Sequence, residues 1–574
     1  MLFVRRIKAI SIVVLVFSGV FTIRAQQLDQ IGKKDAVKIS GGFSANQNFY
    51  FSNDTVKRYN LYNYMLSANA TVSLYGWSIP FNATYSNREL VYGQPFNIYG
   101  LSPTYKSLTI HLGYRSMTLS PLTLSGHSFL GAGVEWTWQK TGFGIAAMGG
   151  RLLKAVDYDT AHAYVIPAFE RWGQGMKLTY GKKGTEIAVI AFHAKDVVGS
   201  IDSVPTHVFL TPQENMVYSI SVKHTINELT VSVERAVSAW TRDLRDTTTL
   251  KDTKASNDLF LIPVNNSTLF YGALNAGVDL AFKKFGVGVA YERIDPDYHT
   301  LGAYFVPNDF ENISLRSNVT LFKTKLTLSG SIGYQHDDLK KQKMTTTDRM
   351  IGNISAGFRP TKRLSLNLSF SSFNSYMKFK PMDDEYLKNT VYDQLDTMNY
   401  IQLSKTFSGS VNYIFLNNDN VTHSGGANSS WQDATSEQGN TRFGNSMLNN
   451  SLSYSILFKK RLLSVSLSVN NMNAYYNTGK SMYVGAGANS SITVLKKKMN
   501  ISLGVNASNN YEDGTMMGIL YSVNNNYSLK FGKHHVFGAG ARFSGKKQQK
   551  ASSLYASNKS FNEWMLTMSY AFRF

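Results

Sequence analysis

Apolar and polar residues alternate along most of the chain, and the last eleven residues show this pattern most clearly. Counting back from the end, every second position carries a large apolar side chain: Phe574, Phe572, Tyr570, Met568, Leu566 and Trp564. The residues between them are mostly small or polar. Because successive side chains of a strand point to opposite faces, this segment predicts a terminal strand with one apolar and one polar face. An edge strand of a soluble sheet and the last strand of a transmembrane barrel both fit.

The same period of two recurs in runs bounded by turn residues, such as 285–289, 326–334, 364–370 and 463–469. Twelve short connections separate such runs, near residues 75–77, 102–104, 140–142, 182–184, 225–227, 283–284, 323–325, 360–362, 417–419, 459–460, 496–498 and 532–533. Longer polar segments lie between them, for example 240–266, 295–310, 336–348, 376–397, 430–445 and 544–560. Short turns that alternate with long loops are typical of outer-membrane barrels.

Two strands for each short turn, with one more at each end, give about 26 strands, within a range of roughly 22 to 28. The first strand is expected near Val37. The predicted fold class is therefore all-β: a large single-chain transmembrane antiparallel β-barrel over residues 37–574, after a cleaved signal peptide. Such a barrel encloses a lumen larger than side chains alone fill. Few residues before Val37 are left for a separate plug.

The N-terminus resembles a secretory signal peptide. Arg5, Arg6 and Lys8 precede an apolar run over residues 9–21, and Ala25 offers a small residue for cleavage. We expect residues 1–25 to be removed and residues 26–36 to form a short periplasmic segment. The chain has no Cys, which excludes a lipoprotein anchor and fits export through an oxidising compartment. No later apolar run is long enough for a spanning helix.

Composition and charge agree with a barrel in a membrane. The chain has 33 Tyr and 34 Phe, enough for an aromatic girdle at each membrane interface. The formal net charge of +21 comes from Lys and Arg that are spread along the chain, many of them in the short turns. We interpret them as solvated charges near anionic lipid headgroups, including lipopolysaccharide. Nucleic-acid binding is disfavoured because no recognition motif or aromatic–basic patch occurs.

Residues 120–133 break the strand rhythm, because they are apolar for a loop and rich in glycine. One hypothesis is that this segment folds into the lumen as a constriction, with His127 and the neighbouring Gly126 facing a conduit. The alternative is a structured hairpin tip in which the glycines allow tight turns.

Residues 291–312 are the second irregular stretch. Glu292, Arg293, Asp295 and Asp297 could form a lumenal charge network. With Asp309 and Glu311 they could also offer oxygen ligands to Ca²⁺, although the spacing does not match an EF-hand loop, and we predict no metal site. The alternative is an external loop held by ion pairs and aromatic packing.

Three smaller groups complete the candidates. Arg242 and Asp243 are assigned to the barrel rim. The acidic run Asp383-Asp384-Glu385 is expected in a solvated loop. Lys546, Lys547 and Lys550 could contact external polysaccharide.

Residues 102–151 and 291–312 resemble a family of uncharacterised outer-membrane barrel proteins of Bacteroidota, and the similarity covers most of the expected mature chain. The resemblance implies the fold and an outer-membrane location, reached through the general secretory pathway. It implies no functional residues.

The leading functional hypothesis is a pore, translocon or transporter component without an integral plug domain. The alternative is a structural or adhesive barrel whose long external loops bind glycan or a surface partner protein. An enzyme is disfavoured, because Ser125 with His127, or His193 with Asp196, are pairings that chance explains and no nucleophile elbow occurs. We expect no cofactor. The expected partners are lipid, lipopolysaccharide, the barrel-assembly machinery through Phe574, and a secreted or surface protein.

Overall fold

The computed structural model describes residues 37–54, 59–87, 97–158, 167–202, 210–247, 261–341, 348–376, 401–438, 441–476, 479–550 and 560–574. Within these ranges every long regular element is a β-strand. None of the described residues forms a helix of the length and apolar character needed to cross a membrane. The expected signal peptide, the segment before Val37 and the acidic run 383–385 lie outside the described residues.

The strands follow one another along the chain. Their bounds are β1 Val37–Ser52, β2 Tyr62–Leu74, β3 Trp77–Ser86, β4 Ile98–Leu101, β5 Thr104–Tyr105, β6 Leu108–Thr118, β7 Ser125–Trp138, β8 Phe143–Leu153, β9 Arg171–Lys182, β10 Thr185–Asp196, β11 Glu214–Ile226, β12 Leu229–Thr241, β13 Thr268–Ala281 and β14 Phe285–Ile294. The second half comprises β15 Phe310–Leu321, β16 Leu326–Asp337, β17 Asp348–Phe358, β18 Leu364–Tyr376, β19 Ile401–Asn417, β20 Val421–Gln438, β21 Thr441–Phe458, β22 Leu463–Tyr476, β23 Gly479–Val494, β24 Met499–Glu512, β25 Thr515–Phe531, β26 His535–Gln548 and β27 Phe561–Arg573.

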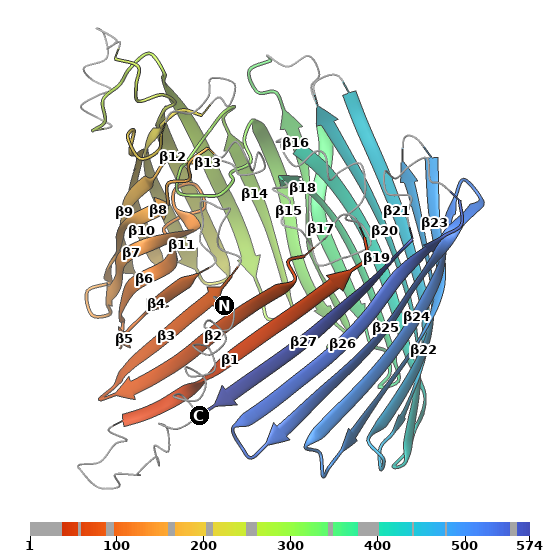
Figure 1. The fold of residues 1–574 in the computed structure, drawn as a ribbon. Coiled ribbons are helices and arrows are strands. Elements are labelled where there is room, and N and C mark those ends of the chain that lie inside the picture. The colour runs from red at the N-terminus through yellow and green to blue at the C-terminus, as the bar shows by residue number, and fades with distance from the viewer. Residues whose placement is uncertain are drawn as a thin grey trace.

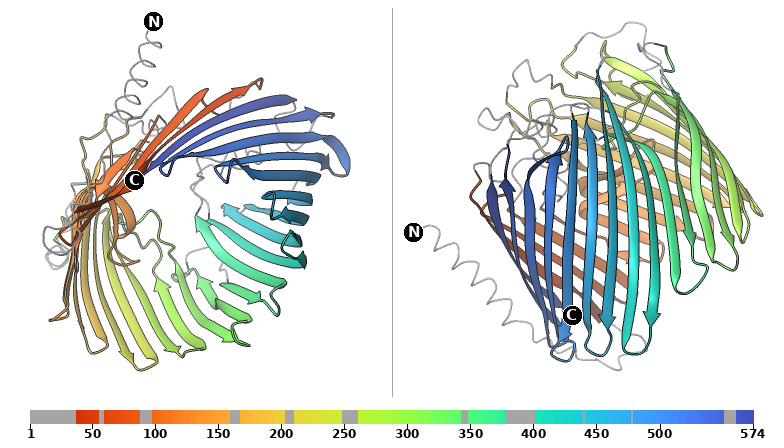
Figure 2. Two further views of the ribbon diagram at one scale, coloured as in Figure 1. Left: turned by 90° about the horizontal axis from the view of Figure 1, so that it is seen from below. Right: turned by 90° about the vertical axis from the view of Figure 1, so that its right-hand side faces the viewer.

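These strands form one closed barrel. Each pairs antiparallel with its neighbours in the chain, and β1 pairs with β27 to close the ring (Figure 1). The short pieces β4 and β5 both lie between β3 and β6, so they form one interrupted strand. The described residues therefore build a 26-stranded antiparallel barrel, which confirms the predicted fold class and strand number. Figure 2 shows the strands as a tilted ring seen along its axis.

The closing seam uses the C-terminal strand as the alternation predicts. Tyr570 lies opposite Ala45, and Trp564 lies opposite Phe51. Beyond the paired strands, the backbone of Phe574 exchanges two hydrogen bonds with Gly41, of 2.9 and 3.0 Å. The apolar residues of β27 lie on the exposed outer face, where 54% of the Met568 surface is accessible.

The outer face is apolar around the whole barrel. Exposed examples from strands far apart in the chain are Val189, Val289, Leu368, Leu452 and Leu467. Aromatic side chains gather at both ends of this surface, as expected for two girdles. Toward the end that holds the short turns lie Phe143 against Tyr180, Phe282 against Phe285, and Phe537 against Tyr570. Toward the other end lie Phe49 against Tyr62, and Phe543 against Trp564. An apolar outer surface with two aromatic belts defines a transmembrane barrel.

Two expected connections differ from the structure. Pro103 does not form the turn near 102–104; it interrupts the β4–β5 strand, and the chain reverses at Lys106, which has a φ of 54°. Pro103 has no N–H to donate, but its carbonyl still accepts a 2.9 Å bond from the Ile110 N–H. Residues 430–445 were expected as a loop, yet β20 and β21 pair through nearly all of them. Polar residues there continue the strands instead of ending them.

Candidate functional site

Two connections between strands meet each other inside the barrel. Residues 119–124 join β6 to β7, and residues 295–309 join β14 to β15; we call these two segments together the clasp. Both leave strands that run away from the end where Phe574 lies. Tyr298 donates a 2.7 Å hydrogen bond to the Leu122 carbonyl, and the Thr300 hydroxyl donates a 2.8 Å bond to the Thr123 carbonyl. The two irregular stretches of the sequence are therefore one structural unit.

The clasp packs on the inner face of the barrel wall. In β10 the exposed, outward Ile187 and Val189 alternate with Ile190 and Phe192, which are fully buried on the inner side. Leu124 and Leu301 of the clasp join Ile190 and Phe192 in one apolar cluster, which also contains Phe129, Met117 and Leu152. Leu122 and Tyr298 join Val217, Ile294 and Phe310 in a second cluster. The clasp thus covers the inner face of the arc from β6 to β15 at the strand ends that lie away from Phe574, whereas inward residues nearer the short turns, such as Arg316 and Asp279, stay exposed.

Polar contacts fix the centre of the clasp to β11 and β12. The carbonyl of His299 accepts a 2.6 Å bond from Ser238, and the N–H of Leu301 donates a 3.1 Å bond to the Asn215 side chain. The His299 ring lies 4.4 Å from the Trp240 ring, measured between centroids. Burial, with a smaller contribution from the positive charge of Arg171, lowers the pKa of His299 to about 4. Burial also raises the pKa of Tyr298, so both side chains are neutral at physiological pH.

The opposite arc of the lumen carries small polar side chains. We call the polar wall the inward positions midway along β18 to β25: Ser365, Asn367, Ser369, Asn412, Ser410, Ser408, Gly426, Asn428, Ser430, Ser453, Ser451, Asn449, Ser466, Ser468, Asn470, Asn489, Gly487, Gly485, Gly504, Asn506, Ser508, Asn526, Asn524 and Ser522. Most of these positions lie opposite one another across the strands, and they alternate with the apolar residues of the outer face. Two inward apolar residues interrupt the set: Met472 lies opposite Asn449, and Leu520 lies opposite Ser508. Hydroxyl pairs such as Ser369 with Ser408, 2.6 Å apart, link adjacent strands.

A cavity of about 850 Å³ lies along the polar wall. Asn428, Asn470, Asn506 and Ser522 are among the residues that line it. Arg542 of β26 is the one charged side chain in its lining. Among the described residues the polar wall therefore lines a cavity, whereas one end of the arc from β6 to β15 is covered by the clasp.

Gly126 and His127 are the second and third residues of β7, directly after the clasp segment 119–124. His127 is only 3% exposed, and its ring stacks at 4.3 Å on the ring of Tyr304, which is itself 58% exposed. Its Nδ1 also lies 2.8 Å from the Ser128 carbonyl oxygen. Gly126 has a φ of +65°, a conformation that favours glycine, where the chain turns from residue 124 into the strand. The His127 ring is therefore buried against Tyr304 and is not exposed as a lining of a conduit.

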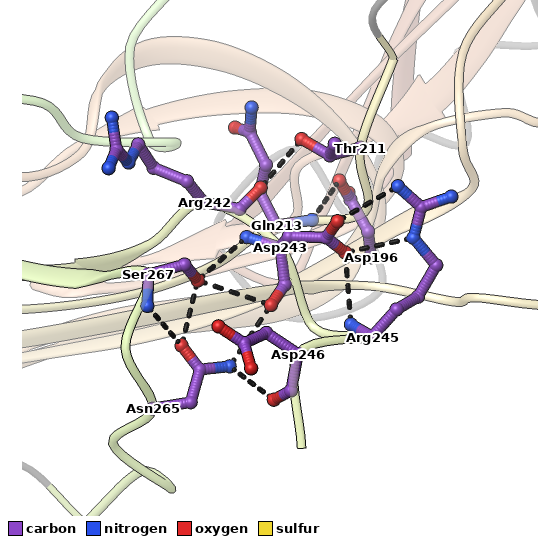
Figure 3. A network of polar contacts seen from close by, with 9 residues as sticks. All are labelled: Asp196, Thr211, Gln213, Arg242, Asp243, Arg245, Asp246, Asn265 and Ser267. Atoms are coloured by element: carbon purple, nitrogen blue, oxygen red, sulfur yellow. Dashed lines mark hydrogen bonds and ion pairs between the residues drawn. The ribbon is translucent and has the colours of Figure 1, made fainter. Parts of the chain in front are cut away.

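Arg242 and Asp243 lie in a network at the rim, between β12 and β13 (Figure 3). Asp243 accepts two bonds of 2.9 Å from the Arg245 guanidinium, which holds the pKa of Asp243 below its usual value. Asn265 donates to the Asp243 carbonyl at 3.0 Å, and the Arg242 carbonyl accepts a 2.6 Å bond from Thr211. Figure 3 shows the Arg242 guanidinium pointing away from this network.

The charged residues of 291–312 do not gather at one point. Arg293 pairs with Glu311 at 3.3 Å, on the strand face that also carries the exposed Val289 and Ile313. Asp295 accepts a 2.7 Å bond from the Gly272 N–H, and Asp309 accepts one of 2.9 Å from the Leu339 N–H. Asp297 occupies a turn with a φ of 61°. Among the described residues there is no group of three or more His, Cys, Asp or Glu side chains able to hold a metal ion.

His193 and Asp196, one of the pairs considered for an enzyme, contact different residues. His193 bonds Glu214 at 2.9 Å, whereas Asp196 accepts two bonds from Arg171, of 2.7 and 2.9 Å. His193 and Asp196 differ by an odd number of residues in β10, so their side chains lie on opposite faces of the strand. Each therefore contacts a different partner, and the two side chains do not meet.

The chain has only distant similarity to known proteins. No family model and no curated protein matches the chain. Similar solved structures include the FrpB iron transporter from Neisseria meningitidis (9% identity, TM-score 0.39, 93% of this chain and 81% of that one). They also include the translocation pore of the P pilus usher PapC (10% identity, TM-score 0.35, 93% and 98%) and OccAB3 of Acinetobacter baumannii (13% identity, TM-score 0.29, 63% and 93%). At such low identities and TM-scores, no role transfers from them.

The closed strand ring, the apolar outer surface and the aromatic belts define the class. The chain is a transmembrane β-barrel of the outer-membrane kind.

Proposed function

We propose that this protein is an outer-membrane pore, either a translocon or a transporter component, that works without a separate plug domain. Its lumen is narrowed by its own clasp on one side and left open along the polar wall on the other. The observation that carries the proposal is the cavity along the polar wall, opposite the apolar clasp. We assign no catalytic role.

The difference between the two arcs supports this proposal. Large apolar side chains that point into a barrel need another apolar segment to pack against, and here the clasp provides it. Small hydroxyl and amide side chains remain solvated, and they leave room for a cargo. The clasp then acts as a built-in constriction, held by the Tyr298 and Thr300 hydrogen bonds.

Conductance in planar lipid bilayers tests the proposal. The purified chain should give stable single-channel currents, and the double variant Tyr298→Phe with Thr300→Val should give larger or noisier ones, because it removes two bonds of the clasp. The double variant Ser44→Ala with Ser67→Ala removes a hydroxyl pair, 2.7 Å apart on β1 and β2, that lies outside both the clasp and the polar wall, and it is the matched control for two lost hydroxyls. A barrel that stays sealed both as wild type and with the clasp loosened would refute a pore.

A second candidate role is suggested by the rim network around Asp243, which joins the two described ends of the connection between β12 and β13 through Asn265 and Ser267. In this alternative the loops bind glycan or a surface protein. The test is a variant that lacks residues 246–264. If it conducts as the wild type does but its cells no longer adhere to glycan-coated surfaces, the binding role is favoured. In both proposals lipopolysaccharide contacts the outer surface and the strand ending at Phe574 is read by the barrel-assembly machinery.

A further inference from the structure

The polar wall is built from fewer residue types than a general aqueous channel needs. Its members are Ser, Asn and Gly, and no charged residue occurs among them. The inner face of the other arc differs, because it carries ion pairs such as Arg316 with Asp279, 3.1 Å apart. The wall is therefore a neutral surface within a strongly basic protein.

The hydrogen-bonding groups of this wall are accessible. Asn428 and Asn506 are exposed, and both line the cavity. Glycines lie beside them in the register: Asn506 is opposite Gly487, where the Asn506 Oδ1 occupies the space that a Cβ would need. The missing side chain at Gly487 thus gives the Asn506 amide its position on the wall. Each Asn amide offers donors and acceptors together, and each Ser hydroxyl does the same.

We propose that the polar wall is a binding surface for neutral saccharides and that uncharged oligosaccharide is the class of cargo. A saccharide presents closely spaced hydroxyls that both donate and accept, which matches the repeated Ser and Asn groups. An extended polypeptide is matched less well, because it carries many ionised and apolar side chains, whereas the positions of the polar wall carry no charge and Arg542, opposite Asn524, is the one charged side chain in the cavity lining. Tyr483 and Tyr521 are the aromatic residues in the cavity lining. This inference deepens the proposed function, since it names what the pore would carry.

Equilibrium binding to the full-length barrel tests the site independently of conductance. The protein is kept in a zwitterionic detergent without a sugar headgroup, and maltohexaose, hexagalacturonate and a Lys-rich peptide are titrated calorimetrically. Maltohexaose should bind at least tenfold more tightly than the other two. The double variant Asn428→Ala with Asn506→Ala should weaken maltohexaose binding by roughly tenfold, as expected for two lost hydrogen bonds.

The matched control is Asn82→Ala with Asn318→Ala, two exposed inward asparagines on β3 and β15, outside the polar wall. It should leave maltohexaose binding unchanged, and heat-modifiable migration in electrophoresis confirms that each variant is folded. Equal binding of the charged probes, tighter binding of the peptide, or an equal loss in the control would overturn the saccharide site. A barrel that binds maltohexaose but never conducts would contradict the pore and leave the site standing. A barrel that conducts but binds no saccharide would do the reverse.

Discussion

Tyr298 donates its hydroxyl proton to the carbonyl oxygen of Leu122, 176 residues earlier in the chain, at 2.7 Å in a fully buried position. This bond joins the two halves of the clasp. Replacing Tyr298 with Phe leaves the Leu122 carbonyl buried without that donor, which costs about 1–3 kcal/mol. We expect residues 119–124 and 295–309 to exchange their amide hydrogens faster while the barrel strands stay protected. Hydrogen exchange followed by mass spectrometry measures this.

Tyr304→Phe is the control for that variant, because Tyr304 is half-exposed and its hydroxyl accepts only from the Ser128 N–H at 3.1 Å. Its effect on exchange in the clasp should be small. Equal acceleration in the two variants would mean that the Tyr298 bond does not hold the clasp.

The stability of the clasp should depend on pH through His299. Its pKa is lowered from 6.5 to about 4 by burial and by the Arg171 charge, so the closed clasp favours the neutral ring. Stabilisation is complete above pH 6.5 and is lost as the pH falls toward 4, with a loss on the order of 2 kcal/mol between pH 7 and pH 5. Exchange in residues 295–309, corrected for the intrinsic pH effect, should rise over this interval. His299→Gln should flatten the dependence; a variant that kept it would point to another group.

The two faces of β22 should respond oppositely to charge. Val469 is 56% exposed on the outer face, and Asn470 is its inward neighbour. Val469→Lys places a charge against lipid and should destabilise the barrel by about 2–4 kcal/mol if it lies near the membrane midplane. Asn470→Lys adds the same side chain to the lumen and should fold normally. Urea titration of folding into lipid vesicles compares the two, and similar losses would contradict the assignment of the faces.

The rim network should be locally rather than globally stabilising. Asp243→Asn removes the charge that pairs with Arg245, and because both side chains are partly exposed the loss should be only about 0.5–1 kcal/mol. Trypsin should cleave after Arg245 several times faster, while the barrel resists. Asp419→Asn, in a short turn at the opposite end, is the charge-matched control. Since Arg245 lowers the pKa of Asp243, the contribution holds above the ordinary pKa of 3.8 and fades only in stronger acid.

The alternation of side chains was enough to predict the barrel and the number of its strands, because a lipid-facing strand requires an apolar residue at every second position. The sequence does not give every turn position. Pro103 predicts a turn, but a strand tolerates a proline where neighbouring backbone hydrogen bonds keep it paired with the adjacent strands. Length and polarity also suggested a loop at 430–445, where strands extend beyond the membrane and no longer need apolar residues.

The candidate site was only partly visible in the sequence. Residues 120–133 and 291–312 stood out as irregular, but nothing in either stretch showed that Leu122 contacts Tyr298. Such a contact depends on the curvature of the eight intervening strands, β7 to β14. The polar wall was present as alternating Ser and Asn, for example Ser464, Ser466 and Ser468 between leucines and valines. The sequence alone does not show that these residues, which come from eight strands, lie together on one inner surface.

The position of the clasp has a consequence for how the barrel assembles. Both of its halves and all the strands that they cover lie between β6 and β15, one continuous arc of sheet in which each strand pairs with its neighbour in the chain. The pairing of β1 with β27 is not needed to build it. An open, curved sheet can therefore form this apolar nucleus first, and the nucleus fixes the curvature of that sheet before its two edges meet.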